Sequence, residues 1–133
     1  MKGPVDELTE TERDALHELE VGIEWFHRAH GHLVAFHHAV GHGMDHLEAA
    51  RRLFRAAGHD RLAATLRDDL LPKGVIDGDR WSYDVVESFQ SSLLTAVVAF
   101  EETARDSVAD GARHVAERAQ ERAWRDRARD GER

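Results

Sequence analysis

The feature of this sequence that most constrains its fold is a long seam of residues spaced three or four apart. The spacing alternates without a slip from Leu16 to Phe54. An unbroken pattern of this kind places every member on one face of a helix, as in long helices that pack with a left-handed twist. The members are Leu16, Leu19, Ile23, Phe26, His30, Leu33, His37, Val40, Met44, Leu47, Arg51 and Phe54.

The seam predicts a first helix over about residues 9–57. Thr9 and Glu12 have the spacing of a capping box at its start, and Gly58 is a natural stop at its end. Glycines at 41 and 43 favour a break, but the seam passes through them. A kink at 41–43 stays open. Small residues also repeat at a spacing of seven, which lets another helix approach closely: Gly22, Ala29, Gly43, Ala50 and Ala57.

Two further helices are expected, so the predicted fold class is all-α with no strand. Asp60 can open a short helix over 60–71, which ends before Pro72. After the turn-rich stretch PKGVIDGDRW, Ser82 can cap a third helix over about 82–128, and the tail 129–133 is expected to fray. The chain length of 133 residues fits a single helical domain.

Two long helices joined by a short one predict an antiparallel hairpin. An isolated hairpin buries one side of each helix, so we expect a homodimer that forms a four-helix bundle. The alternative is a compact three-helix bundle with the first helix broken at Gly41.

Composition excludes several classes of function. A formal charge of −8 argues against a nucleic-acid partner, because binding phosphates requires a basic face. The absence of cysteine excludes disulfides and thiolate chemistry. The apolar run Leu93–Phe100 is too short to cross a membrane, and the opening MKGPVDELTE lacks the apolar core of a signal peptide. We therefore expect a cytoplasmic protein without a membrane partner.

The acidic, lysine-poor composition is similar to that of proteins from salt-loving archaea. The segment GHGMDHLEAARRLFRAAGHDRLAATLRDDLLPKGVIDGDRWSYD resembles a family of uncharacterised haloarchaeal helical proteins. That resemblance implies an acidic surface suited to concentrated salt, and no activity.

Seven histidines between His27 and His46 suggest a transition-metal site. Glu24-x-x-His27 has the spacing used in dimetal helical bundles, and His30 and His37 lie on the seam. In an antiparallel hairpin, residues near 110–114 fall at the level of Glu24. The expected inner site is therefore Glu24, His27, His30, His37, Asp110 and His114. The alternative is that the seam histidines are core residues bonded to carboxylates.

A rival site lies on the outer face of the first helix. Histidines spaced by four can hold a metal between adjacent turns, yet these positions face away from the seam. The same residues fit a solvated ladder: His38, His42, Asp45 and His46. The other histidines, His17, His32 and His59, read as ordinary surface residues.

The leading hypothesis is therefore a helical bundle that binds iron, manganese or zinc through inward His, Glu and Asp side chains. A structural or protein-interaction module without a ligand is the first alternative. The second is a dimetal redox or oxygen-handling protein, since the pattern loosely resembles hemerythrin-like and ferritin-like bundles. We assign no catalytic residue, and an enzyme is the less favoured class.

Overall fold

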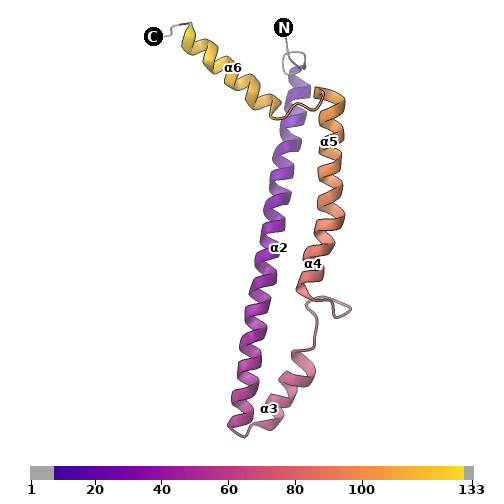
Figure 1. Cartoon of the computed structure of the whole chain (residues 1–133), viewed down its shortest axis with the longest axis vertical. Coiled ribbons are helices and arrows are strands. Elements are labelled where there is room, and N and C mark those ends of the chain that lie inside the picture. Colours follow the sequence, from indigo (N-terminus) through magenta and orange to yellow (C-terminus); the bar gives the residue numbers. More distant parts are fainter. Residues whose placement is uncertain (1–7, 131–133) are drawn as a thin grey trace. The chain divides into compact units, whose positions relative to one another are not determined.

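The computed structural model of the protein describes residues 8–130, and all regular secondary structure in that range is helical (Figure 1). The elements are α2 (Glu10–Ala56), α3 (Asp60–Thr65), η1 (Leu66–Leu70), α4 (Ser82–Phe89), η2 (Gln90–Leu94), α5 (Thr95–Ala109) and α6 (Val115–Arg129). The segments η1 and η2 are short π-helical stretches. In residues 8–130 the only β-type pairing is an isolated bridge between Ile76 and Arg80. The predicted all-α class is confirmed.

The contacts divide the chain into two compact units, and the boundary between Arg28 and Ala29 falls within α2. We call Met1–Arg28 with Leu93–Arg133 the terminal unit and Ala29–Ser92 the central unit. None of the helices described in these units combines the length and apolar composition needed to cross a bilayer.

The helix α2 begins with the capping box that the sequence predicts. The Thr9 N–H donates to Glu12 Oε1 at 2.8 Å, and the Glu12 N–H donates to Thr9 Oγ1 at 3.1 Å. The helix is uninterrupted at Gly41 and Gly43 and ends before Gly58, whose φ of 87° suits glycine. The alternative of a first helix broken at Gly41 is therefore wrong.

The core of the terminal unit forms where the start of α2 meets the end of α5 and the start of α6. Leu8, Leu16, Ala109 and Val115 are buried together there, and Val115 is fully buried. This packing holds the first turn of α6 against α2.

The helix expected over 82–128 is interrupted, which corrects the sequence prediction. After Ala109 the backbone turns through left-handed conformations at Asp110 (φ 49°), Gly111 (φ 83°) and His114 (φ 56°). Aspartate and glycine tolerate such values better than most residues. The Gly111 N–H donates to Arg105 O at 3.1 Å, which satisfies a carbonyl at the end of α5. Asp110 and His114 therefore do not share a helix face, as the prediction required.

In the central unit, Ser82 has a different role from the cap that the sequence predicts. The carboxylate of Asp84 accepts the Trp81 N–H at 3.0 Å at the start of α4. Ser82 is buried, and its Oγ lies 2.7 Å from His37 Nδ1. This hydrogen bond links α4 to the middle of α2.

Candidate metal centre

A glutamate on α2 meets the first residues of α6 in the terminal unit. The backbone N–H of His114, the residue that precedes α6, donates to Glu20 Oε1 at 3.0 Å. The left-handed conformation of His114 turns the chain so that its side chain also faces this carboxylate, with Nδ1 3.5 Å from Glu20 Oε2. Glu20 thus uses one oxygen to hold the start of α6 and leaves the other facing an imidazole.

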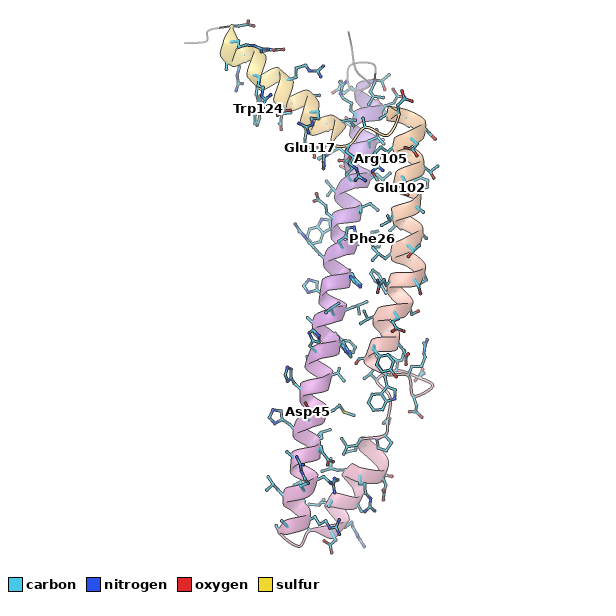
Figure 2. All side chains as sticks on the ribbon, in the orientation of Figure 1. Phe26, Asp45, Glu102, Arg105, Glu117 and Trp124 are labelled. Atoms are coloured by element: carbon cyan, nitrogen blue, oxygen red, sulfur yellow. The ribbon has the colours of Figure 1, made fainter. Side chains whose placement is uncertain are left out.

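Glu117 completes a group of three potential ligands. It lies in the first turn of α6 (Figure 2), and one ligand atom from each of Glu20, His114 and Glu117 lies within 4.8 Å of the other two. Glu117 also lies near a second imidazole, with His17 Nδ1 at 3.3 Å from Glu117 Oε2. Two imidazoles and two carboxylates therefore lie at the junction of α2 and α6.

Two of these donor atoms are buried without a hydrogen bond. His17 Nδ1 and Glu20 Oε2 are shielded from solvent, yet neither has a hydrogen-bond partner among the described residues. Each lies near an oppositely charged or chargeable group but is not aligned to bond with it. A buried polar atom without a partner costs free energy, so a ligand that binds either atom would stabilise the junction.

The separations fit ligands of one metal ion. Zinc bonds of about 2.1 Å in tetrahedral geometry place neighbouring ligand atoms about 3.4 Å apart. The separation of 3.5 Å between His114 Nδ1 and Glu20 Oε2 is close to that value, and so is the 3.3 Å between His17 Nδ1 and Glu117 Oε2, although His17 lies outside the group of three. Two carboxylates and two neutral imidazoles also balance the charge of a divalent cation.

The surroundings set limits on how tightly an ion could bind. The Glu20 side chain is 16% exposed, whereas that of His114 is 59% exposed, so water can reach one side of the junction. The start of α6 carries partial positive charge, which favours the two carboxylates and opposes a cation. Without a metal, the same groups can form ion pairs when the histidines are protonated.

The structure brings together three of the six residues of the predicted inner site. Glu24, His27 and His114 line one cavity of about 200 Å³ in the terminal unit. Its remaining lining residues are Glu20, Ile23, Glu101 and Arg113. The cavity therefore opens beside the Glu20–His114 contact.

The other three predicted residues have different surroundings. His30 and His37 belong to the central unit, where the His30 ring stacks on Phe89 at a centroid distance of 6.3 Å. His37 contacts Ser82, as described above. Asp110 caps the end of α5 in a left-handed conformation. Both seam histidines are partly buried, as expected for inward positions.

The rival outer residues His38, His42, Asp45 and His46 are all exposed on α2. Asp45 is labelled on this helix in Figure 2. No group of three potential ligands within bonding range of one ion forms there among residues 8–130.

Sequence reasoning missed Glu20, Glu117 and His17. The prediction took residues 82–128 as one straight helix, and on such a helix Glu117 does not lie near Glu20. The dipeptide Asp110-Gly111 was the available signal, because Asp-Gly commonly marks a turn. A turn at that point directs residues 114–117 back onto α2.

Comparisons with protein-family models, with curated proteins and with solved structures found no match to this chain.

Proposed function

We propose that this protein binds a divalent transition-metal ion at the junction of α2 and α6. Glu20, His114 and Glu117 supply three ligands, and His17 supplies a fourth beside Glu117. The observation that carries this proposal is the grouping of Glu20, His114 and Glu117, whose ligand atoms lie within 4.8 Å of one another and include a buried oxygen, Glu20 Oε2, that has no hydrogen bond.

The donor set favours zinc, with iron and manganese as the competing ions. Imidazole suits zinc and iron, and carboxylates are accepted by all three metals. A partly exposed site with two carboxylates also leaves room for a water ligand. We therefore expect zinc to bind most tightly of the three.

The decisive experiment measures metal content and affinity on untagged protein purified without a nickel column. Elemental analysis is expected to give about one metal ion per chain. Titration calorimetry of the stripped protein with zinc chloride should give one site. Zinc at 100 times its Kd should raise the free energy of unfolding by about 2.7 kcal/mol. Stripped protein that binds zinc only in sub-stoichiometric amounts would favour a structural or interaction module instead.

The variant Glu20→Gln separates the metal site from the fold. Its amide oxygen can still accept the His114 N–H, whereas its NH₂ group cannot act as a ligand in place of Oε2. Zinc binding should be lost and the helical circular dichroism kept. Glu24→Gln, one turn along α2, is the matched control and should bind normally.

A second pair of variants tests the two sites expected from the sequence. His30→Leu with His37→Leu, and His42→Gln with His46→Gln, should each leave one zinc site intact. If either double variant lost stoichiometric zinc while Glu20→Gln still bound it, the zinc site would lie elsewhere than at the start of α6.

We also propose that the chain forms an antiparallel hairpin that dimerises into a four-helix bundle. An apolar groove of about 510 Å³ in the terminal unit supports this arrangement. Phe100 lines the groove with a residue exposure of 61%, a costly arrangement for so large an apolar ring. The groove is lined by Glu12, Ala15, Leu16, Glu18, Leu19, Phe100, Ala104 and Val108. A second copy would cover it with the same apolar face.

Light scattering at dilute and molar salt tests the dimer. The native chain should have the mass of a dimer in molar salt, where repulsion between acidic surfaces is screened. Phe100→Glu should give a monomer, whereas Trp124→Glu, an equally large change at an exposed site outside the groove, should not. A native monomer at both salt concentrations would refute the bundle.

A further inference from the structure

The central unit contains a concentration of arginine that stands out in an acidic chain. Residues 51–67 contain Arg51, Arg52, Arg55, Arg61 and Arg67 but a single acidic residue, Asp60. The whole chain carries a net charge of −8. Acidic residues flank this stretch at Glu48, Asp68 and Asp69, so the basic character is confined to residues 51–67.

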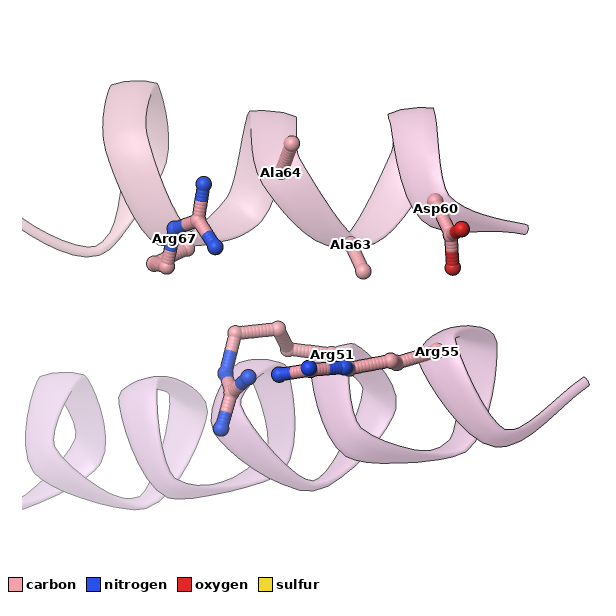
Figure 3. A pocket seen from close by; sticks show the side chains of 6 residues that line it. All are labelled: Arg51, Arg55, Asp60, Ala63, Ala64 and Arg67. Atoms are coloured by element: carbon pink, nitrogen blue, oxygen red, sulfur yellow. The ribbon is translucent and has the colours of Figure 1, made fainter. Parts of the chain in front are cut away.

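Three of these arginines line one cavity of about 260 Å³ (Figure 3). Arg51 and Arg55 come from the last turns of α2, and Arg67 comes from η1 on the opposite side. Ala63 and Ala64 contribute only methyl groups to the lining, which leaves the space between the guanidinium groups open. Asp60 is the one acidic residue in the lining.

Two of the three guanidinium groups are held in place by carboxylates outside the cavity lining. Arg51 donates from Nε and Nη2 to Glu48 at 2.7 and 2.8 Å, and Arg67 donates in the same way to Asp68 at 2.8 and 2.9 Å. A guanidinium has five N–H groups, so about three remain on each for another acceptor. The carboxylates fix the direction of these remaining donors.

The positive charges also act on one another. The hydrogen bond that Arg51 donates to Glu48 holds the pKa of Arg51 above its ordinary value, whereas the charge of Arg67 opposes that shift. An anion between the two guanidinium groups would replace this repulsion with attraction.

We propose that this cavity, which we call the arginine pocket, binds the phosphate or diphosphate group of a small molecule. Guanidinium groups match the geometry of phosphate oxygens and donate two parallel hydrogen bonds. The volume suits a group of one or two phosphates. The arginine pocket lies in the central unit and is independent of the metal site proposed above.

Titration calorimetry with sodium phosphate and sodium pyrophosphate, at constant ionic strength set with sodium chloride, tests the arginine pocket. The native chain should bind one pyrophosphate. Arg55→Gln and Arg67→Gln should each weaken binding by about tenfold or more, since each variant loses charge-assisted hydrogen bonds to the anion, and tenfold corresponds to about 1.4 kcal/mol. Asp60→Asn should strengthen it, because a negative charge leaves the lining.

The matched controls are Arg52→Gln and Arg61→Gln, which remove the same charge from the same segment but do not line the cavity. Each should change pyrophosphate affinity by less than about threefold, the size of a screened charge effect. Circular dichroism checks that all five variants keep the native helix content. No binding of either anion by the native chain would overturn the proposal, and so would equal losses in the lining and control variants.

Discussion

Replacing Glu101 by leucine should destabilise the terminal unit strongly, although leucine favours a helix. Glu101 and Arg105 lie one turn apart on α5, with residue exposures of 8% and 7%. Arg105 Nη1 donates to both carboxylate oxygens of Glu101 at 2.9 Å. Removing the carboxylate leaves the guanidinium buried without its ion-pair partner.

The expected loss follows from that burial. Removing one partner of a buried ion pair lowers the free energy of unfolding by about 3–5 kcal/mol, because the remaining charge keeps its desolvation penalty. For a chain of this size, 1 kcal/mol corresponds to roughly 3–5 °C in Tm, so Glu101→Leu should lower Tm by roughly 9–25 °C. The double variant Glu101→Leu with Arg105→Met should recover most of the loss, because neither charge is then buried.

Thermal and urea unfolding, followed by circular dichroism, would measure both effects. The control is Glu102→Leu, the neighbouring exposed position on α5, which should change stability by less than about 0.5 kcal/mol. A Glu101→Leu variant as stable as that control would show that Arg105 is adequately solvated and that the reasoning is wrong.

Three further changes follow from particular contacts. Gly111→Ala should cost about 1–2 kcal/mol in urea unfolding, because φ is 83° there, and an unchanged midpoint would contradict this. His30→Leu should stabilise the chain by about 1 kcal/mol, since Nε2 of His30 is buried without a hydrogen-bond partner. His37→Leu should destabilise the chain by about the same amount, because the hydrogen bond between His37 and the buried Ser82 hydroxyl is lost. Equal effects of these two changes would refute that distinction. The Arg51 hydrogen bond lowers the pKa of Glu48 below its ordinary value of 4.5, so this carboxylate contributes stability above pH 4.5 that is lost as pH falls through its lowered pKa. Unfolding free energies of Glu48→Gln should fall less steeply than those of the native chain below pH 4.5.

The sequence was most informative about α2. The seam and the capping box predicted a helix over about residues 9–57, and each end of that range differs by one residue from the observed helix Glu10–Ala56. The seam also separated partly buried His30 and His37 from exposed His38, His42 and His46. Periodicity predicts these features well because they depend on a single helix.

The candidate site could not be read from periodicity, because it depends on a turn between helices. Asp110 and Gly111 were treated as helical residues, so the register beyond them was projected along a straight axis. His114 was predicted as a metal ligand, yet its neighbours Glu20 and Glu117 were not. The distances between them are fixed by three left-handed residues whose conformation follows from local chemistry and the burial of Val115.

The helix α6 has one buried residue, Val115, in its fifteen. Local opening of a helix requires only the loss of the contacts that hold it, so α6 can exchange its amide hydrogens while the other helices keep theirs. The Glu20 hydrogen bond to His114 and the proposed metal ligands lie at the same end of the helix as Val115. An ion bound there would slow amide exchange throughout α6, including turns far beyond its ligands. A protease or partner that requires an open α6 would then act more slowly on the metal-bound protein than on the metal-free protein.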